Sequence, residues 1–197
     1  MTGIKLPHDW YPDSLPPGVS LGARSWLYSS FAFIHCRSTR PAPVRIGADS
    51  GVYYTSFFDL GPSGQVEIGD FCSVVGAVFA TNGRVEVHDY AFLAHDVTIA
   101  DSAWSTPPRS ATPARAKAPA IIVGPNAWIG ARAVLLAGAV IGANAIVGAG
   151  AVVDGPVPDD AVVVGNPARI VRSGSVAQAS RRGTWATTDA GLPATIE

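Results

Sequence analysis

The sequence predicts an all-β fold, a parallel β-helix built from six-residue repeats, and three observations support this prediction. Aliphatic residues recur at every sixth position in the second half of the 197-residue chain. Small residues recur four positions after them. Hydrophobic residues make up 48% of the chain and charged residues only 15%, so much apolar surface has to be buried within the chain or against copies of itself. A period of six fits neither an α-helix nor a simple alternating strand.

The clearest repeat begins at Val123. Its aliphatic positions are Val123, Ile129, Leu135, Ile141, Val147 and Val153, and four positions after each comes a small or apolar residue: Ala127, Ala133, Ala139, Ala145, Ala151 and Val157. Each repeat fits a short strand and a turn with one large side chain pointing inward, and three repeats, about 18 residues, would close one triangular coil. A buried alanine-rich helix is disfavoured, because each of its glycines would cost roughly 1 kcal/mol.

A weaker form of the same repeat runs through the first half of the chain. Its large apolar positions are Leu21, Leu27, Phe33, Ile46, Val52, Ile68, Val74, Val87, Leu93 and Ile99. The pattern is interrupted around residues 34–45, 53–67, 79–86 and 100–122, and each interruption is expected to leave the coil as an extruded loop. Stacked coils would pair every strand with its neighbours except at the two ends.

The repeat divides the chain into three parts. Residues 19–172 form the predicted β-helix. Residues 1–18 contain four prolines and are expected to be an extended lead-in that caps one open end of the helix. Residues 173–197 are polar and rich in small side chains, and they are expected to form a short C-terminal tail that is mobile or docked at the periphery.

Charge and composition argue against several functional classes. A formal net charge of −1 argues against a nucleic-acid partner. No uninterrupted apolar run is long enough for a membrane span, and the N-terminus lacks the pattern of a secretory signal, so we expect a cytoplasmic protein without a membrane partner. Cys36 and Cys72 are too few for a disulfide framework and lack the spacing of a metal site, so we interpret them as small buried hydrophobic residues.

Two short motifs give the chain a family resemblance. They are the run Asn-Ala-Trp-Ile-Gly at residues 126–130 and the closing Gly-Asn-Pro-Ala-Arg at residues 165–169. Together with the repeat over roughly residues 19–172, they resemble the hexapeptide-repeat acyltransferases of the isoleucine-patch acetyltransferase superfamily. The resemblance implies a left-handed β-helix, a homotrimer, and transfer of an acyl group from acetyl-CoA, the co-substrate, to a hydroxyl or amine of a small, sugar-like acceptor.

The resemblance also implies a position for CoA in a cleft between two subunits. The pantetheine arm would lie along the backbone near Gly130–Ala131 and Gly148–Ala149, where small side chains permit close approach. Arg169 or Arg172 could meet the CoA phosphates, although both could equally be a solvated basic pair.

A lysine that many relatives carry near the end of the repeat is replaced here by Asp154-Gly155. Residues 102–153 contain no Asp or Glu, and this local surplus of positive charge would attract an anionic cofactor. The positive residues of this stretch are Arg109, Arg115, Lys117 and Arg132.

Acyl transfer needs a base that removes the proton of the attacking hydroxyl or amine. Maltose, galactoside and streptogramin acetyltransferases carry this base in a loop that corresponds to residues 100–105, and no histidine stands there. The amino-sugar N-acetyltransferases carry it on the coil, and the resemblance to their motif selects His95, with Asp96 or Asp101 to orient the imidazole. A turn histidine without a role remains the alternative.

Two other functions remain to be weighed. A zinc-dependent carbonic anhydrase on the same helix would need three histidines around one ion, and the spacing of His35, His88 and His95 does not match that family, so no metal is expected. His8 in the lead-in receives no role, and structural roles are expected for His35 and His88. A non-catalytic trimer that binds a ligand or serves in assembly is the second alternative.

Aromatic residues suggest two places for the acceptor. Trp104, in the proline- and alanine-rich segment 101–120, could pack against a sugar or a pantetheine arm, or could simply anchor that segment. Residues 53–67 contain four more aromatic residues, which could form an acceptor wall or pack at the trimer interface: Tyr53, Tyr54, Phe57 and Phe58.

Overall fold

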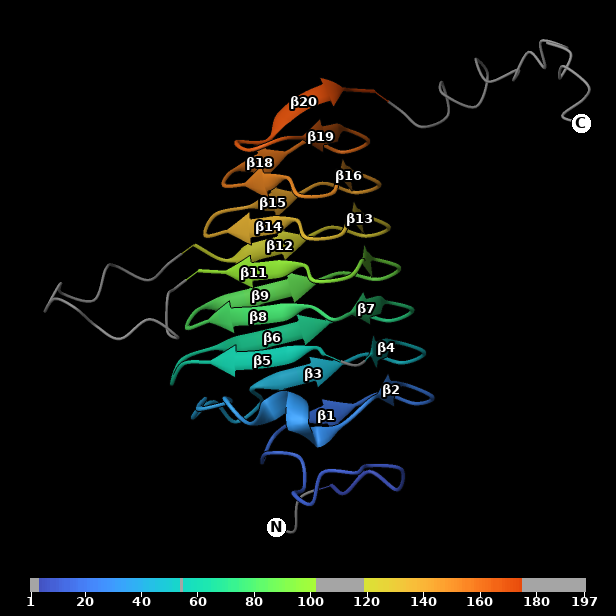
Figure 1. The fold of residues 1–197 in the computed structure, drawn as a ribbon, viewed down its shortest axis with the longest axis vertical. Helices are drawn as coiled ribbons and strands as arrows, with labels where there is room; N and C mark the ends of the chain where they lie inside the picture. Colours follow the sequence, from blue (N-terminus) through green and yellow to red (C-terminus); the bar gives the residue numbers. More distant parts are fainter. Residues whose placement is uncertain (1–3, 54, 102–118, 175–197) are drawn as a thin grey trace, which may run out of the picture.

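A computed structural model describes residues 4–53, 55–101 and 119–174. These residues form a left-handed parallel β-helix whose coils stack along one long axis (Figure 1). The all-β prediction is confirmed, since the described chain contains only one short helix, the 3-10 helix η1 (Ser30–Phe33). No helix within the described ranges is long and apolar enough to cross a membrane.

Three sheets form the three sides of the triangular coil. Side A consists of β1 (Ser20–Leu21), β3 (Val44–Ile46), β6 (Gln65–Ile68), β9 (Arg84–Val87), β12 (Ile121–Val123), β15 (Val140–Ile141) and β18 (Pro156–Val157). Side B consists of β2 (Trp26–Leu27), β4 (Gly51–Tyr53), β7 (Ser73–Val75), β10 (Phe92–Leu93), β13 (Trp128–Ile129), β16 (Ile146–Val147), β19 (Val162–Val164) and β20 (Arg169–Arg172). Side C consists of β5 (Phe57–Leu60), β8 (Val78–Thr81), β11 (Thr98–Ala100), β14 (Val134–Leu136) and β17 (Val152–Val153).

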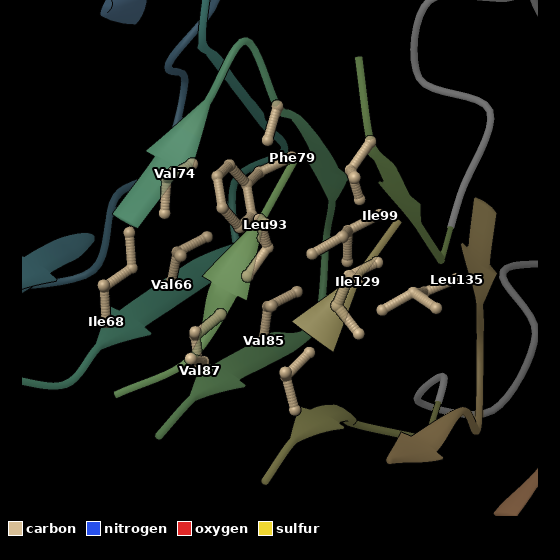
Figure 2. Close-up of a cluster of buried hydrophobic side chains, with 14 of the residues drawn as sticks. Val66, Ile68, Val74, Phe79, Val85, Val87, Leu93, Ile99, Ile129 and Leu135 are labelled. Carbon is tan, nitrogen blue, oxygen red and sulfur yellow. The ribbon is translucent and has the colours of Figure 1, made fainter. Parts of the chain in front are cut away.

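The predicted inward positions line the interior of the helix. All six aliphatic residues from Val123 to Val153 at six-residue spacing are at most 3% exposed. Figure 2 shows the same ladder in the middle coils, where side chains such as Leu93 and Ile99 point toward one another from different sides. Burial of these side chains removes apolar area from water, which is the main favourable term for a fold of this kind.

Phenylalanine side chains continue the ladder inside the N-terminal coils. Phe33 stacks on Phe58 with ring centroids 4.7 Å apart, and Phe58 stacks on Phe79 at 5.0 Å. The interplanar angles are only 4° and 3°, because parallel coils place equivalent side chains directly above one another.

Two of the four predicted loops are wrong. Residues 53–67 contain β5 and the first part of β6, and residues 79–86 contain most of β8 and β9. These segments stay in the coil but lose the phase of six, because the coils here are longer. The number of residues between two paired positions measures the length of a coil. It is larger between Val44 and Val66, and between Gln65 and Arg84, than between Ile122 and Val140. Residues 34–43 contain no strand, and most of the fourth interruption, residues 102–118, lies outside the described residues.

The turns between sides repeat one backbone shape in successive coils. Between sides A and B the turn residue has a φ of 54–61° at Arg24, Asp49, Phe71, Tyr90, Asn126, Asn144 and Asp160. Between sides B and C it has a φ of 59–67° at Thr55, Gly76, Asp96, Arg132 and Gly150. This left-handed region is uncommon for residues other than glycine, so its recurrence marks a turn that the stacking of coils imposes.

Residues at both ends of the repeat pack on it. Leu6 and Leu15 of the N-terminal segment are buried in the same core cluster as the first coils. The His8 ring stacks on Trp26 at 4.1 Å, and its Nε2 lies 2.9 Å from the Leu27 carbonyl. At the other end β20 pairs antiparallel with β19 and covers the last edge of side B.

Candidate active site

His95 lies at the corner between sides B and C. It is the first residue of the turn that joins β10 to β11, two positions after the buried Leu93, so its side chain is exposed. Its carbonyl accepts a hydrogen bond of 2.8 Å from the backbone N–H of Arg132 in the next coil. Within the described chain the imidazole itself has no hydrogen-bond partner, so the ring is free to meet a ligand.

The residues predicted to hold CoA stack directly above His95. Arg132 follows Ala131 in the turn above, and the N–H of Gly150, next to Ala149, donates to the Ala131 carbonyl at 2.9 Å. Successive coils rise by about 4.8 Å. The structure therefore brings the predicted base and both predicted cofactor segments onto one corner, although His95, Ala131 and Ala149 stand far apart in the sequence.

Glycine is required at Gly130 by the stacking of the coils. A Cβ atom there would lie 2.6 Å from the backbone N of Ala149, and one at Gly148 would lie 2.7 Å from Cγ1 of Val164. Both positions leave bare backbone along this edge of side B. These glycines therefore serve the close stacking of successive coils.

Arg169 and Arg172 lie at opposite ends of β20. In the β19–β20 register Arg169 pairs with Val164, whereas Arg172 pairs with Val162 at the other end of the strand. Val164 lies above Gly148. Arg169 is therefore at the upper end of the B–C column, the stack of corner turns that contains His95, Ala131 and Ala149. Both arginine side chains are exposed.

Asp96 forms an ion pair with Arg132 across one coil. The distance between Arg132 Nε and Asp96 Oδ2 is 3.7 Å, and the two side chains are 80% and 60% exposed. Such an exposed pair contributes little to stability. The corner thus carries a pair of opposite charges, with Asp96 next to His95 and Arg132 one coil above it. The other predicted charges, Arg109, Arg115 and Lys117, and Trp104 lie outside the described residues.

Asp101 lies away from His95, because β11 separates the two residues. Its carboxylate accepts hydrogen bonds from Thr81 Oγ at 2.5 Å and from the backbone N–H groups of Asn82 and Gly83 at 2.9 Å. These bonds fix the turn between sides C and A. The structure thus gives Asp101 a structural partner set and does not bring it to the imidazole.

The remaining histidines lie on other parts of the helix. His88 begins a turn between sides A and B, where Nε2 lies 3.6 Å from a Glu86 oxygen, and His35 is exposed in the segment after η1. Across the residues with a described placement, no group of three or more His, Cys, Asp or Glu side chains could hold a metal ion. Cys36 is half-buried and Cys72 buried, and neither forms a disulfide.

The predicted aromatic acceptor wall is divided by the fold. Tyr53 and Phe57 line a pocket at the N-terminal end of the B–C corner, together with Trp10 and Phe31. Phe58 is fully buried in the core, so its assignment to a ligand wall or an interface is wrong. Tyr54 lies outside the described residues. Sequence reasoning missed Trp10 and Phe31, because only the fold brings them to this corner.

Comparison with known proteins agrees with the repeat and the fold. A family model described as bacterial transferase hexapeptide (six repeats) matches residues 120–155, so this stretch carries that repeat. A comparison with curated proteins gives no match.

Several solved structures share the architecture. A mutant form of AntD, an N-acyltransferase from Bacillus cereus in complex with dTDP and coenzyme A, is 19% identical with a TM-score of 0.61, over 82% of this chain and 86% of that one. The polySia-specific acetyltransferase NeuO is 19% identical with a TM-score of 0.57, over 88% and 91%. The acetyltransferase VCA0836 from Vibrio cholerae is 22% identical with a TM-score of 0.52, over 80% and 74%. At these identities the likeness establishes the fold.

Proposed function

We propose that the protein is a CoA-dependent acyltransferase that transfers an acetyl group to a hydroxyl or amine of a small, sugar-like acceptor. The observation that carries the proposal is the single B–C corner that holds His95, Gly130–Ala131 and Gly148–Ala149 in successive coils. Structural neighbours of this fold include an N-acyltransferase with bound CoA, which supports the same reaction class.

His95 is the proposed general base. Its imidazole removes the proton from the acceptor as the oxygen or nitrogen attacks the thioester carbonyl. The tetrahedral intermediate then collapses, the carbon–sulfur bond breaks, and the thiolate of CoA takes the proton from the imidazolium. Because no described side chain bonds the ring, we propose that Asp96 on the same turn or a group of a neighbouring subunit orients it.

The chemistry of the B–C column suits an acyl-CoA. Backbone of the glycine-containing edge would accommodate the amide-containing pantetheine arm, which binds through hydrogen bonds rather than charge. Arg169, at the upper end of the column, and Arg132, one coil above His95, would neutralise the phosphate groups of CoA. Arg172, at the opposite end of β20, is a weaker candidate for this contact.

A homotrimer would complete the site. His95, Asp96 and Arg132 lie on an open corner of one chain, so a second copy beside it is needed to turn the corner into a cleft. Exposed aromatic side chains on the outer face of side B and the adjoining A–B corner, Phe71, Tyr90, Phe92 and Trp128, would be covered by such association. We place the protein in the cytoplasm, where acetyl-CoA is available.

The test of this function is thiol release from acetyl-CoA in the presence of sugars, amino-sugar nucleotides and small amines, alongside calorimetric titration of CoA. Turnover with at least one acceptor is expected. As a matched pair, Ala149→Trp at the column should abolish CoA binding, whereas Ala143→Trp at an A–B corner should not.

A non-catalytic binding trimer is the second candidate, and the absence of an orienting partner for His95 within the described chain favours it. Saturable CoA binding without thiol release across the whole panel would select this candidate. Turnover would exclude it.

A further inference from the structure

An aromatic pocket lies at the N-terminal end of the same B–C corner. It is lined by the N-terminal segment, η1 and the first strands of sides B and C, at the lower end of the helix in Figure 1, and it is open to solvent on one side. Its volume is about 270 Å³. The side chains that decide its chemistry are Trp10, Tyr28, Phe31, Tyr53, Ser56 and Phe57.

The walls of the pocket are fixed by contacts between aromatic rings. Trp10 packs on Phe31 with centroids 5.3 Å apart, and Phe31 packs edge-on against Phe57 at 5.7 Å. Tyr11 packs against both Trp10 and Phe31, with centroids 5.7 Å and 5.2 Å away. Every described side chain that lines the pocket is uncharged, which favours an uncharged ligand group.

Ser56 lines the pocket and contains a buried polar atom that lacks a partner. The residue is 4% exposed, and its Oγ is the buried side-chain polar atom for which the described chain offers no hydrogen bond. The other buried hydroxyl groups are bonded, as Ser50 shows: its Oγ donates to the Gly69 carbonyl at 2.7 Å and accepts from the Cys72 N–H at 2.8 Å. A buried hydroxyl without a partner is costly unless something supplies one.

We propose that this pocket binds a flat, uncharged aromatic ring that carries one hydrogen-bonding substituent, with the substituent bonded to Ser56 Oγ. Aromatic walls favour stacked or edge-on contact with such a ring. The volume falls just below the usual range for pockets that hold whole drug-sized ligands, so it suits a single ring system. Phenols, indoles and uncharged nucleobases share this chemistry.

The pocket is aligned with His95 along the corner. Thr55 lines the pocket, and the turns of Thr55, Gly76 and Asp96 stack in successive coils. A Cβ atom placed on Gly76 would lie 2.8 Å from Thr55 Oγ and 3.6 Å from the backbone N of Asp96. Two coils correspond to about 10 Å. If the proposed function holds, the ring is one end of the acceptor and its acylated group lies about 10 Å away. The binding of the ring itself does not depend on that function.

The direct test uses phenol and toluene as probes of equal shape, titrated by calorimetry into the full chain without any acyl-CoA. Wild type should bind both saturably, and phenol more tightly. Ser56→Ala should weaken phenol binding about ten-fold and leave toluene binding unchanged, because only phenol uses the hydroxyl. Ser50→Ala, a buried serine outside the pocket, is the matched control and should change neither affinity.

A pocket-filling variant, Ala32→Leu, should abolish binding of both probes while its circular dichroism spectrum stays that of wild type. No saturable binding of either probe to wild type would overturn the inference, and so would equal weakening of phenol by Ser56→Ala and Ser50→Ala. These titrations contain no acyl-CoA, so they measure ring binding alone. The proposed acyltransferase activity is tested separately by thiol release.

Discussion

Side chains at the turns carry the chemistry of this protein, because the inward positions of each side are taken by aliphatic, aromatic or small residues. The corner position of His95 follows from the sequence, since the residue stands two places after an inward leucine. The role of Asp101 does not follow from the sequence, because its partners lie in the coil below, about twenty positions earlier in the chain. Which residues meet between two coils depends on the length of the coils. This length varies in the N-terminal half of the protein, so the partners of Asp101 could not be predicted.

Replacement of Asp101 by alanine should lower the free energy of unfolding by about 2 kcal/mol, because three donors at Thr81, Asn82 and Gly83 lose a charged acceptor. Urea denaturation measures this difference. Asp96→Asn is the control and should have little effect, since the ion pair of Asp96 is exposed and asparagine tolerates its left-handed backbone. Equal losses in the two variants would show that Asp101 is not a structural residue.

Ser56→Ala and Ser50→Ala should affect stability in different ways. Removal of the unpartnered Ser56 hydroxyl should leave the free energy of unfolding unchanged or raise it. Removal of the Ser50 hydroxyl should lower it by about 1–3 kcal/mol, because the Cys72 N–H loses its acceptor. Thermal unfolding followed by circular dichroism compares them. A loss for Ser56→Ala as large as that for Ser50→Ala would mean that its hydroxyl is bonded in the protein.

At the scale of the strands, a strict period of six predicts the coils from β12 to β17 and fails on both sides of them. In the last coil Val157 pairs with Ile141, so it takes an inward strand position and not the small position predicted for it. The coil that follows β12 keeps three repeats of six positions and has short strands, so every inward side chain falls in phase. In the N-terminal coils, strands such as β5 and β6 are longer and have two inward positions each, and the steps from Val44 to Val66 and from Gln65 to Arg84 lengthen the coils. The extra residues disrupt the repeat in the sequence while the coil continues in space.

The phenylalanine stack inside side C should dominate the stability of the N-terminal coils. Phe79→Ala is expected to lower the free energy of unfolding by about 3–5 kcal/mol, because it removes a fully buried ring and its contact with Phe58. Chemical denaturation measures the effect. Phe92→Ala, whose ring is partly exposed on side B, should cost about 1 kcal/mol or less. A comparable cost at both positions would show that the phenylalanine stack is not the core of the N-terminal coils.

The contact between the N-terminal segment and η1 should weaken in acid. Burial raises the pKa of Asp9, but the Ser29 hydroxyl and the N–H groups of Ser30 and Tyr11 outweigh it and bring the pKa down to about 2. Since the folded-state pKa lies below the ordinary value of 3.8, the carboxylate stabilises the fold above about pH 4 and loses this effect as the pH falls toward 2.

The measurement is the difference in unfolding midpoint between wild type and Asp9→Asn as the pH is lowered. The difference should be constant above about pH 4 and should shrink between pH 4 and 2. A difference that does not change with pH would show that Asp9 does not make these bonds in solution.

For the whole molecule, the open B–C corner predicts that one chain is not sufficient. The mass in solution should be about three times the 20.3 kDa of one chain at micromolar concentration. Trp128→Lys, on the exposed aromatic face, should shift the protein toward smaller species and weaken CoA binding with it. Val140→Lys, on the outer face of side A, should do neither. A monomeric wild type that still binds CoA would contradict the intersubunit cleft.

The most direct test of the acyltransferase with His95 as its base is the comparison of wild type with His95→Gln in thiol release from acetyl-CoA, with CoA affinity measured on the same samples. Glutamine keeps much of the shape of histidine but cannot take up the proton. We predict that kcat falls by at least about 100-fold while the dissociation constant for CoA stays within about two-fold. Unchanged turnover in His95→Gln would show that the base lies elsewhere and would contradict the proposed mechanism.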